Sequence, residues 1–264
     1  MKHETIPLWD RPDAPALQAY WPDARTTQAA VILFAGGAYH TRVPHEAYAG
    51  WFAEKGMAAF VCDYRVYPHQ FPLPLLDARR AVRLLRHRAE RYGLDKNKIL
   101  VLGSSAGGHL AALVSTYTEA IDGEGADEVD RESPVPNGQI LCYPVIHLVS
   151  RRLGANIGSA QNLLGDRVLE IGEKLTPAYL ATASTPPCFL WHTAADSVVP
   201  MGNSLDYARA LQENGVPVEL HVFPYGRHGL GLAEEPDDPA IRHAAQWKLL
   251  LLRWLALEGF LPEQ

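Results

Sequence analysis

The chain has 264 residues, of which 47% are hydrophobic and 20% are charged, a composition typical of a globular protein with one large core. Its formal net charge of −6, with basic residues concentrated only on one amphipathic helix, argues against a nucleic-acid-binding protein. The N-terminal residues lack the apolar stretch of a secretory signal and the apolar run Leu249–Leu252 is too short to span a bilayer, so we expect a cytoplasmic protein with no membrane partner.

Strand-like and helix-like segments alternate along the chain. Residues Thr5–Asp10 and Leu17–Trp21 predict an opening hairpin. Further apolar runs predict buried strands at Ala30–Phe34, Ala58–Cys62, Ile99–Leu102, Ile140–Tyr143, Phe189–His192 and Val218–Val222. Helical patterns follow at Leu75–Leu85, Ser204–Glu213 and Ile241–Leu257. The alternation predicts one α/β domain over residues 1–264, with a mostly parallel sheet of about eight strands and helices on both faces.

Two groups of side chains in these segments carry further predictions. The first predicted helix has an apolar stripe and, on its other side, a row of arginines, Arg79, Arg80, Arg83 and Arg86. Given the acidic balance of the chain, we interpret this row as a solvated face and not as a polyanion site. The three cysteines, Cys62, Cys142 and Cys188, lie in apolar runs and are typical of buried thiols in a reducing compartment.

The hexapeptide Gly103–Gly108 follows a predicted strand and precedes a helical stretch. Its first five residues fit G-x-S-x-G, in which small neighbours let the central serine, here Ser105, occupy a strained strand-to-helix turn. A tight surface turn would tolerate the same residues, so the hexapeptide alone does not show that Ser105 is a nucleophile. Candidate partners elsewhere in the chain are needed for that conclusion. Ligands of parallel sheets bind beyond the carboxyl ends of the strands, where Ser105 is expected.

A serine becomes nucleophilic when a histidine, oriented by a carboxylate, takes its proton. In α/β hydrolases the order along the chain is serine, acid, histidine. Asp196 directly follows a predicted strand and is the candidate acid, although an Asp there could simply cap a helix; Asp166 and Asp237–Asp238 lie in loops and are weaker candidates. His228 is the candidate base, because glycines on both sides let its loop present the imidazole after the last strand.

Backbone N–H groups are needed where negative charge develops on the substrate oxygen. Ala106, the residue after Ser105, would supply one such donor. The loop after the first buried strand, Ala35–Tyr39, contains two glycines and lies at the place from which the second donor should come. The donor loop, nucleophile, acid and base follow one another along the chain in the order of α/β hydrolases.

The stretches that carry a family resemblance are residues 35–39, 63–65, 103–110, 143–144, 158–165, 192–196 and 228–231. From about Ala30 onward the chain resembles α/β-hydrolase serine esterases near the hormone-sensitive-lipase group, and especially the bifunctional carbohydrate esterases that remove acetyl and feruloyl groups from xylan. The resemblance implies an α/β-hydrolase fold with Ser105 as nucleophile, Asp196 as acid and His228 as base. It also implies oxyanion donors at Gly37, Ala38 and Ala106. The related lipases have His-Gly-Gly-Gly in this loop, whereas here Ala35 and Ala38 replace the histidine and the third glycine.

The lengths of two segments predict little or no cap over the site. About 29 residues precede the first buried strand and about 40 separate Tyr143 from Pro186. An open site leaves long acyl chains unburied, at about 0.8 kcal/mol per CH₂, so we expect acetyl esters of carbohydrates, as small molecules or oligosaccharides. Tyr39 and Trp191 are candidates to offer flat faces to a sugar ring, although either could simply belong to the core.

Other functions compete with the esterase prediction. Triad chemistry also serves arylformamidases and amidases, and a hydrolase-like fold can bind ligands without turnover, although such proteins usually lose a triad member. No Gly-Lys-Ser/Thr follows Gly103–Gly108, and no H-x-x-x-H or C-x-x-C spacing indicates a metal site. We therefore expect no cofactor, no metal and no nucleic-acid partner, whereas homo-oligomerisation is compatible with the sequence. The sequence does not indicate a role for residues 158–165.

Overall fold

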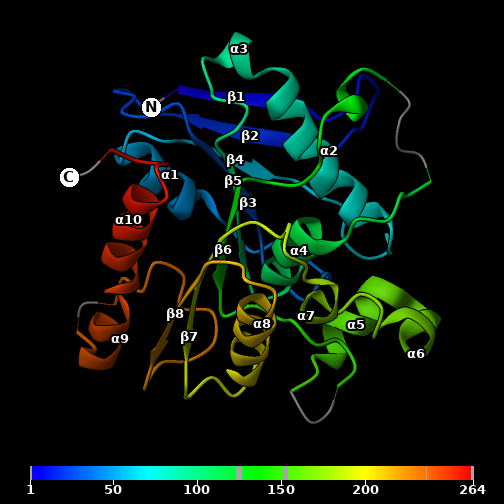
Figure 1. Cartoon of the computed structure of the whole chain (residues 1–264), viewed down its shortest axis with the longest axis vertical. Helices are drawn as coiled ribbons and strands as arrows, with labels where there is room; N and C mark the ends of the chain where they lie inside the picture. Colours follow the sequence, from blue (N-terminus) through cyan, green and yellow to red (C-terminus); the bar gives the residue numbers. More distant parts are fainter. Residues whose placement is uncertain (1, 123–126, 151–153, 236, 263–264) are drawn as a thin grey trace.

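Eight strands form one sheet through the molecule (Figure 1) in the computed structural model, which describes residues 2–122, 127–150, 154–235 and 237–262. The strands are β1 (Lys2–Pro7), β2 (Ala16–Trp21), β3 (Ala30–Phe34), β4 (Ala58–Cys62), β5 (Ile99–Ser104), β6 (Gly138–Cys142), β7 (Cys188–Thr193) and β8 (Val218–Phe223). Their order across the sheet is β1-β2-β4-β3-β5-β6-β7-β8. β2 pairs antiparallel with β1 and β4, and the other pairings are parallel. The predicted mostly parallel α/β-hydrolase sheet is confirmed.

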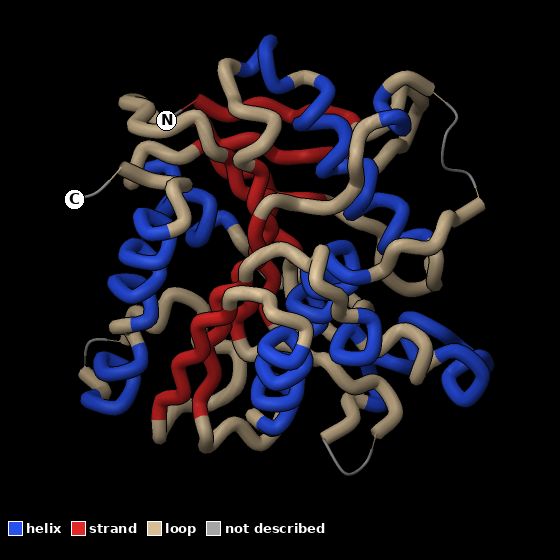
Figure 2. The backbone as a smooth tube through the Cα atoms, in the orientation of Figure 1, coloured by secondary structure: helices blue, strands red, loops and turns tan. Residues whose placement is uncertain are grey.

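Helices cover both faces of this sheet (Figures 1 and 2). One face is covered by α1 (Glu46–Glu54), α9 (Pro239–Ala244) and α10 (Trp247–Leu257). The other face is covered mainly by α2 (Leu73–His87), α4 (Ala106–Thr116) and α8 (Gly202–Glu213). The shorter helices are α3 (Ala89–Tyr92), α5 (Ile157–Leu164), α6 (Val168–Ile171), α7 (Pro177–Leu180), and the 3₁₀ turns η1 (Val129–Arg131) and η3 (Gly165–Arg167). None of the helices in the described residues is long and apolar enough to cross a membrane.

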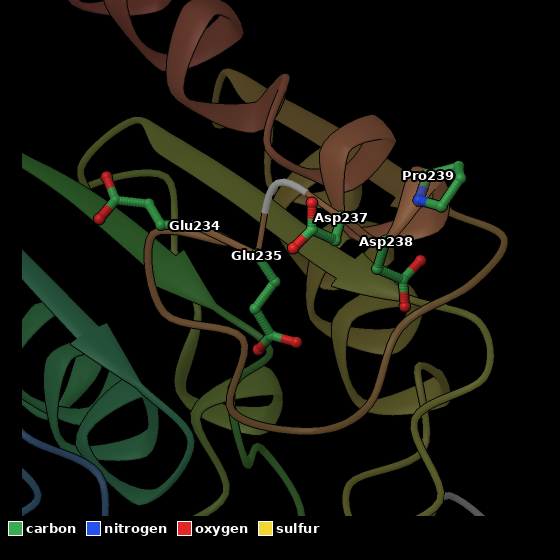
Figure 3. A pocket seen from close by; sticks show the side chains of 5 residues that line it. All are labelled: Glu234, Glu235, Asp237, Asp238 and Pro239. Atoms are coloured by element: carbon green, nitrogen blue, oxygen red, sulfur yellow. The ribbon is translucent and has the colours of Figure 1, made fainter.

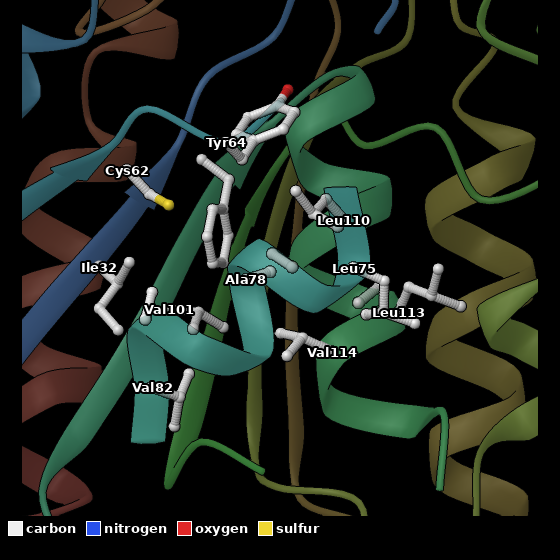
Figure 4. Packing of buried hydrophobic residues seen from close by; sticks show 14 of the residues in the cluster. Ile32, Cys62, Tyr64, Leu75, Ala78, Val82, Val101, Leu110, Leu113 and Val114 are labelled. Carbon is white, nitrogen blue, oxygen red and sulfur yellow. The ribbon is translucent and has the colours of Figure 1, made fainter. Parts of the chain in front are cut away.

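The continuous apolar runs of the central strands follow from this two-sided cover. In β3, Ala30, Ile32 and Phe34 pack under α2 and α4, whereas Val31 and Leu33 pack under α1 and α10. Figure 4 shows the α2 and α4 side, where Ile32, Cys62 and Val101 on the strands meet apolar side chains of the two helices. All three cysteines are free and buried, as predicted. Each fully buried Val, Leu or Ile side chain contributes about 1.5–3 kcal/mol.

The arginine row of α2 is buried, so the prediction of a solvated face is wrong. Arg79, Arg80, Arg83 and Arg86 are 2%, 4%, 8% and 8% exposed. Residues 117–122 and 127–137 cover them, and main-chain carbonyls of these residues accept hydrogen bonds from Arg79, Arg83 and Arg86. Arg80 pairs with Asp127 at 2.6 Å and with Asp130 at 2.9 Å. A guanidinium has five N–H donors, so each arginine can satisfy several loop acceptors and remain inside.

Candidate active site

Ser105 lies at the sharp junction between β5 and α4. Its backbone angles, φ 54° and ψ −120°, are in a region that costs a non-glycine residue about 1–3 kcal/mol. Two glycines allow this turn by close approach: a Cβ at Gly103 would lie 2.0 Å from the Gly107 carbonyl oxygen, and a Cβ at Gly107 would lie 2.1 Å from that of Phe34. The G-x-S-x-G pattern therefore has a steric cause, and it projects the serine beyond the carboxyl end of its strand.

The structure brings Ser105, Asp196 and His228 together from the ends of β5, β7 and β8. His228 Nδ1 lies 2.6 Å from Asp196 Oδ2, and His228 Nε2 lies 2.8 Å from Ser105 Oγ. Because an ionised carboxylate only accepts hydrogen bonds, Nδ1 carries the proton and Nε2 is free to accept the serine hydroxyl proton. The arrangement can therefore activate the serine as a nucleophile.

Asp196 is a buried carboxylate with several hydrogen-bond donors around it. The backbone N–H groups of Val198 and Val199 both donate to Oδ1 at 2.9 Å. Burial opposes the charged form and acts to raise the pKa of Asp196, but hydrogen bonds from His192, His228 and the Val199 N–H outweigh it and bring the pKa below its ordinary value. Asp196 is thus held as a carboxylate that keeps His228 in the required tautomer.

The three expected oxyanion donors lie at the same end of the sheet. Gly37 and Ala38 follow β3 and line the pocket that contains Ser105 and His228, and Ala106 begins α4. Among the described residues, none accepts a hydrogen bond from the backbone N–H groups of Gly37, Ala38 or Ala106. Backbone donors without an internal acceptor beside a nucleophile can stabilise a developing oxyanion.

The pocket around Ser105 has a volume of about 450 Å³. Val43, Pro44, Tyr48 and Tyr143 form apolar parts of its lining, and further lining comes from Asn156, Ser159 and Val198, of which the first two lie at the start of α5. The segment between β6 and β7 folds into α5, α6 and α7, of which the longest has 8 residues.

Tyr39 and Trp191 do not lie where a sugar-binding face would need them. Each side chain has 0% exposure. Trp191 stacks on Trp247 with ring centroids 5.1 Å apart, and the Tyr39 hydroxyl contacts His109. The expectation that these rings face a sugar is corrected, because both are core residues.

Two residues next to the triad were given no role by the sequence analysis. His45 Nε2 lies 2.9 Å from Ser104 Oγ, and its Nδ1 lies 3.0 Å from the Val43 carbonyl oxygen. The carbonyl only accepts, so Nδ1 donates to it and Nε2 accepts from Ser104; burial lowers the pKa of His45. Tyr143 Oη accepts from the Gly231 N–H at 3.0 Å and so fixes the loop that carries His228. No local motif marked His45, and Tyr143 belonged to the matching stretch 143–144 without an assigned role.

A second depression is acidic (Figure 3). It is lined by Glu234, Glu235, Asp237, Asp238 and Pro239. Glu235 pairs with Arg227, Glu234 pairs with Lys248 at 3.3 Å, and Asp238 caps α9. Within the described ranges, no three His, Cys, Asp or Glu side chains gather in a way that could hold a metal ion.

Comparison with known proteins shows that the chain is similar to α/β-hydrolase esterases. A model of the BD-FAE family matches residues 17–211. The chain is 36% identical to an endo-1,4-beta-xylanase B of Butyrivibrio fibrisolvens over 84% of this chain and 35% of that protein. It is 29% identical to an acetylxylan esterase of Xylanibacter ruminicola over 80% of this chain and 43% of that protein. The chain thus spans less than half the length of these two curated relatives.

A solved structure matches almost end to end. It is the acetyl ester-xyloside bifunctional hydrolase from Caldicellulosiruptor lactoaceticus, with 42% identity and a TM-score of 0.87 over 98% of this chain and 97% of that one. An esterase from Thermogutta terrifontis matches with 27% identity and a TM-score of 0.81, over 99% of this chain and 94% of that one.

Proposed function

The chain belongs to the BD-FAE family of α/β hydrolases, and from this premise we propose that it is a serine esterase that acts on short-chain carboxylic esters through an acyl-enzyme. The observation that carries the proposal is the position of His228, whose two ring nitrogens lie 2.8 Å from Ser105 Oγ and 2.6 Å from Asp196 Oδ2. A carboxylate, an imidazole and a hydroxyl in this order form a nucleophile with its base.

In the first half of the reaction, Ser105 Oγ attacks the ester carbonyl carbon while His228 Nε2 takes the hydroxyl proton. The carbonyl oxygen becomes negatively charged, and the N–H groups of Gly37, Ala38 and Ala106 donate to it. His228 then gives its proton to the departing alcohol oxygen, and the acyl group stays on Ser105. One donor of this kind contributes roughly 10²–10³ in kcat.

In the second half, a water molecule replaces the alcohol. His228 Nε2 takes one proton from the water as its oxygen attacks the acyl carbon, and the same N–H groups stabilise the second oxyanion. His228 returns the proton to Ser105 Oγ as the acid leaves. Asp196 stays ionised throughout and stabilises the imidazolium that forms twice in each turnover.

The proposed substrates are acetyl esters of carbohydrates. Support comes from the relatives named acetylxylan esterase and acetyl ester-xyloside hydrolase, and from the short helices between β6 and β7, which offer little surface to a long acyl chain. We expect acetyl and propionyl esters to be hydrolysed faster than octanoyl esters, because each unburied CH₂ forgoes about 0.8 kcal/mol.

The test combines two substitutions with two substrate series. Ser105→Ala should lose roughly 10³-fold or more in kcat, whereas Ser104→Ala, which removes the neighbouring hydroxyl, should lose far less. A series of nitrophenyl esters measures the acyl preference, and acetate release from acetylated xylo-oligosaccharides measures action on sugars. Full activity of Ser105→Ala would refute the mechanism, a maximum at octanoyl would refute the acyl preference, and no acetate from any sugar ester would refute the substrate class.

A further inference from the structure

The loop that carries the oxyanion donors has an unusual backbone. Gly37, Ala38 and Tyr39 have φ of 122°, 54° and 57°. The Gly37 carbonyl accepts from the His40 N–H at 2.9 Å, so Ala38 and Tyr39 are the central residues of a turn with positive φ at both positions, as in type I′ turns. Such positions favour Gly, Asn and Asp. Alanine and tyrosine there cost about 1 kcal/mol or more each, so contacts outside the turn must hold them.

Hydrogen bonds to the carbonyl groups account for this conformation. All carbonyl oxygens from residue 35 to residue 39 accept one: Ala35 from Tyr64 Oη at 2.5 Å, Gly36 from the Val43 N–H at 3.0 Å, Gly37 from the His40 and Thr41 N–H groups, Ala38 from Asn162 Nδ2 at 2.9 Å, and Tyr39 from the Tyr67 N–H at 2.8 Å. In a planar trans peptide, C=O and N–H point in opposite directions. Carbonyls that bond to the protein therefore leave the N–H groups of Gly37 and Ala38 to the pocket.

The bond from Asn162 to the Ala38 carbonyl differs from the others in its distance along the chain. Asn162 lies on α5, 124 residues away, and Ala38, whose carbonyl it binds, is one of the two central residues of the turn. α5 is anchored independently, because Asn156 caps its N-terminus through a 2.9 Å bond from the Ser159 N–H and the Leu163 carbonyl accepts from the Phe71 N–H at 2.8 Å. A fixed helix thus presents an amide donor to the middle of the strained turn.

A hydrogen bond of the Tyr39 side chain also stabilises the turn. Its hydroxyl lies 2.8 Å from His109 Nδ1, and His109 Nε2 lies 2.9 Å from the Leu175 carbonyl oxygen. The carbonyl only accepts, so Nε2 carries the proton and Tyr39 donates to Nδ1. This bond fixes the side chain of Tyr39, whereas Asn162 fixes the peptide between Ala38 and Tyr39.

We propose that Asn162 is a positioning residue for ester hydrolysis: it holds the Ala38 carbonyl so that the turn stays at positive φ and the N–H groups of Gly37 and Ala38 stay aimed at the oxyanion. Without this bond, Ala38 can relax to negative φ, which turns the preceding peptide and its N–H away. The triad is untouched by this change. The inference rests on the proposed function, and it assigns a role to the segment 158–165.

The experiment compares Asn162→Ala with Gln161→Ala, which removes an exposed amide from the adjacent position of the same helix. Steady-state kinetics with nitrophenyl acetate give kcat and KM, and the inhibition constant of phenylboronic acid reports binding of a tetrahedral adduct on Ser105. Asn162→Ala should lower kcat by roughly tenfold, less than the full loss of a donor, with KM within about twofold. The boronic acid should bind more weakly by a similar factor, and Gln161→Ala should match the parent protein.

A second variant covers the case in which Asn162→Ala does not fold. Asn162→Asp keeps the size of the side chain, and its carboxylate at neutral pH cannot donate to a carbonyl, so it should show the same losses. An unchanged kcat in a folded variant, a loss confined to KM, or unchanged boronic acid binding would overturn the inference. If Ser105→Ala abolishes activity while the Asn162 variants keep full kcat, only this inference fails; if Ser105→Ala stays active, the proposed function itself fails.

Discussion

His109 couples the stability of the fold to pH. It lies on the first turns of α4, is 0% exposed, and accepts from Tyr39 while donating to the Leu175 carbonyl. Burial lowers the pKa of His109 from 6.5 to about 4; the Leu175 hydrogen bond opposes this shift, and His147 nearby adds to it. The folded protein therefore keeps this imidazole neutral at pH values where the unfolded chain protonates it.

The sign and size of the effect follow from the two pKa values. Between pH 6.5 and about 4 the unfolded state binds more protons, so the free energy of unfolding falls as the pH is lowered. One pH unit in this window is worth about 1.4 kcal/mol. Lowering the pH from 7.5 to 5 should therefore remove about 2 kcal/mol through His109 alone, a large share of the 5–15 kcal/mol typical of a folded domain.

The substitution His109→Gln isolates this contribution. A glutamine side chain can accept from Tyr39 through its oxygen and donate to Leu175 through its nitrogen, and it does not titrate. Urea unfolding followed by tryptophan fluorescence at pH 7.5 and pH 5 gives the loss of stability in each protein. The buried His45 and His147, whose pKa values are also lowered by burial, are present in both proteins and cancel. The parent should lose about 2 kcal/mol more than the variant; equal losses would refute the reasoning.

The remaining predictions concern the triad, the elbow and the arginine row. Asp196→Asn should lower kcat by roughly 10³–10⁴ with the fold intact, because an amide can favour the wrong tautomer of His228; a loss below tenfold in steady-state kinetics would contradict it. Gly107→Ala should lower Tm strongly or prevent folding, because its Cβ would lie 2.1 Å from the Phe34 carbonyl oxygen; an unchanged melting curve would contradict it. Arg80→Lys should lower the free energy of unfolding by about 2 kcal/mol in urea titrations. The control Arg91→Lys, at an exposed position, should leave it unchanged in the same assay.

Residues whose role is local could be predicted from the sequence. The runs Ala30–Phe34 and Ala58–Cys62 have the predicted strand bounds, because a strand covered on both faces must be apolar at every position. The G-x-S-x-G turn could be predicted because only glycines allow the backbone approaches at positions 103 and 107. The order of serine, acid and histidine along the chain reduced the number of candidates for the catalytic acid and base.

Residues whose role depends on a distant segment could not be predicted. The arginines of α2 have the spacing of an exposed face, and only the loop folded over them makes that face internal. Asn162 is one polar residue on a short helix, and its partner at Ala38 lies 124 positions away. Tyr39 is the last residue of the donor loop, yet its ring turns into the core toward His109. In each case the environment of the side chain is set by tertiary packing, and no local sequence pattern indicates it.

The arginine row also determines how freely the loop above it can change during evolution. Five of the loop groups that these arginines hold are main-chain carbonyls, those of Tyr117, Glu119, Glu132, Ser133 and Val135. Every amino acid has a main-chain carbonyl, so substitutions at these loop positions leave the hydrogen bonds in place. The side chains of Asp127 and Asp130, which pair with Arg80, and of Asn137, whose Oδ1 accepts from Arg86 at 3.0 Å, are exceptions. The helix therefore holds the described parts of the loop mainly through main-chain groups, so the side chains at these five positions can change without loss of the bonds.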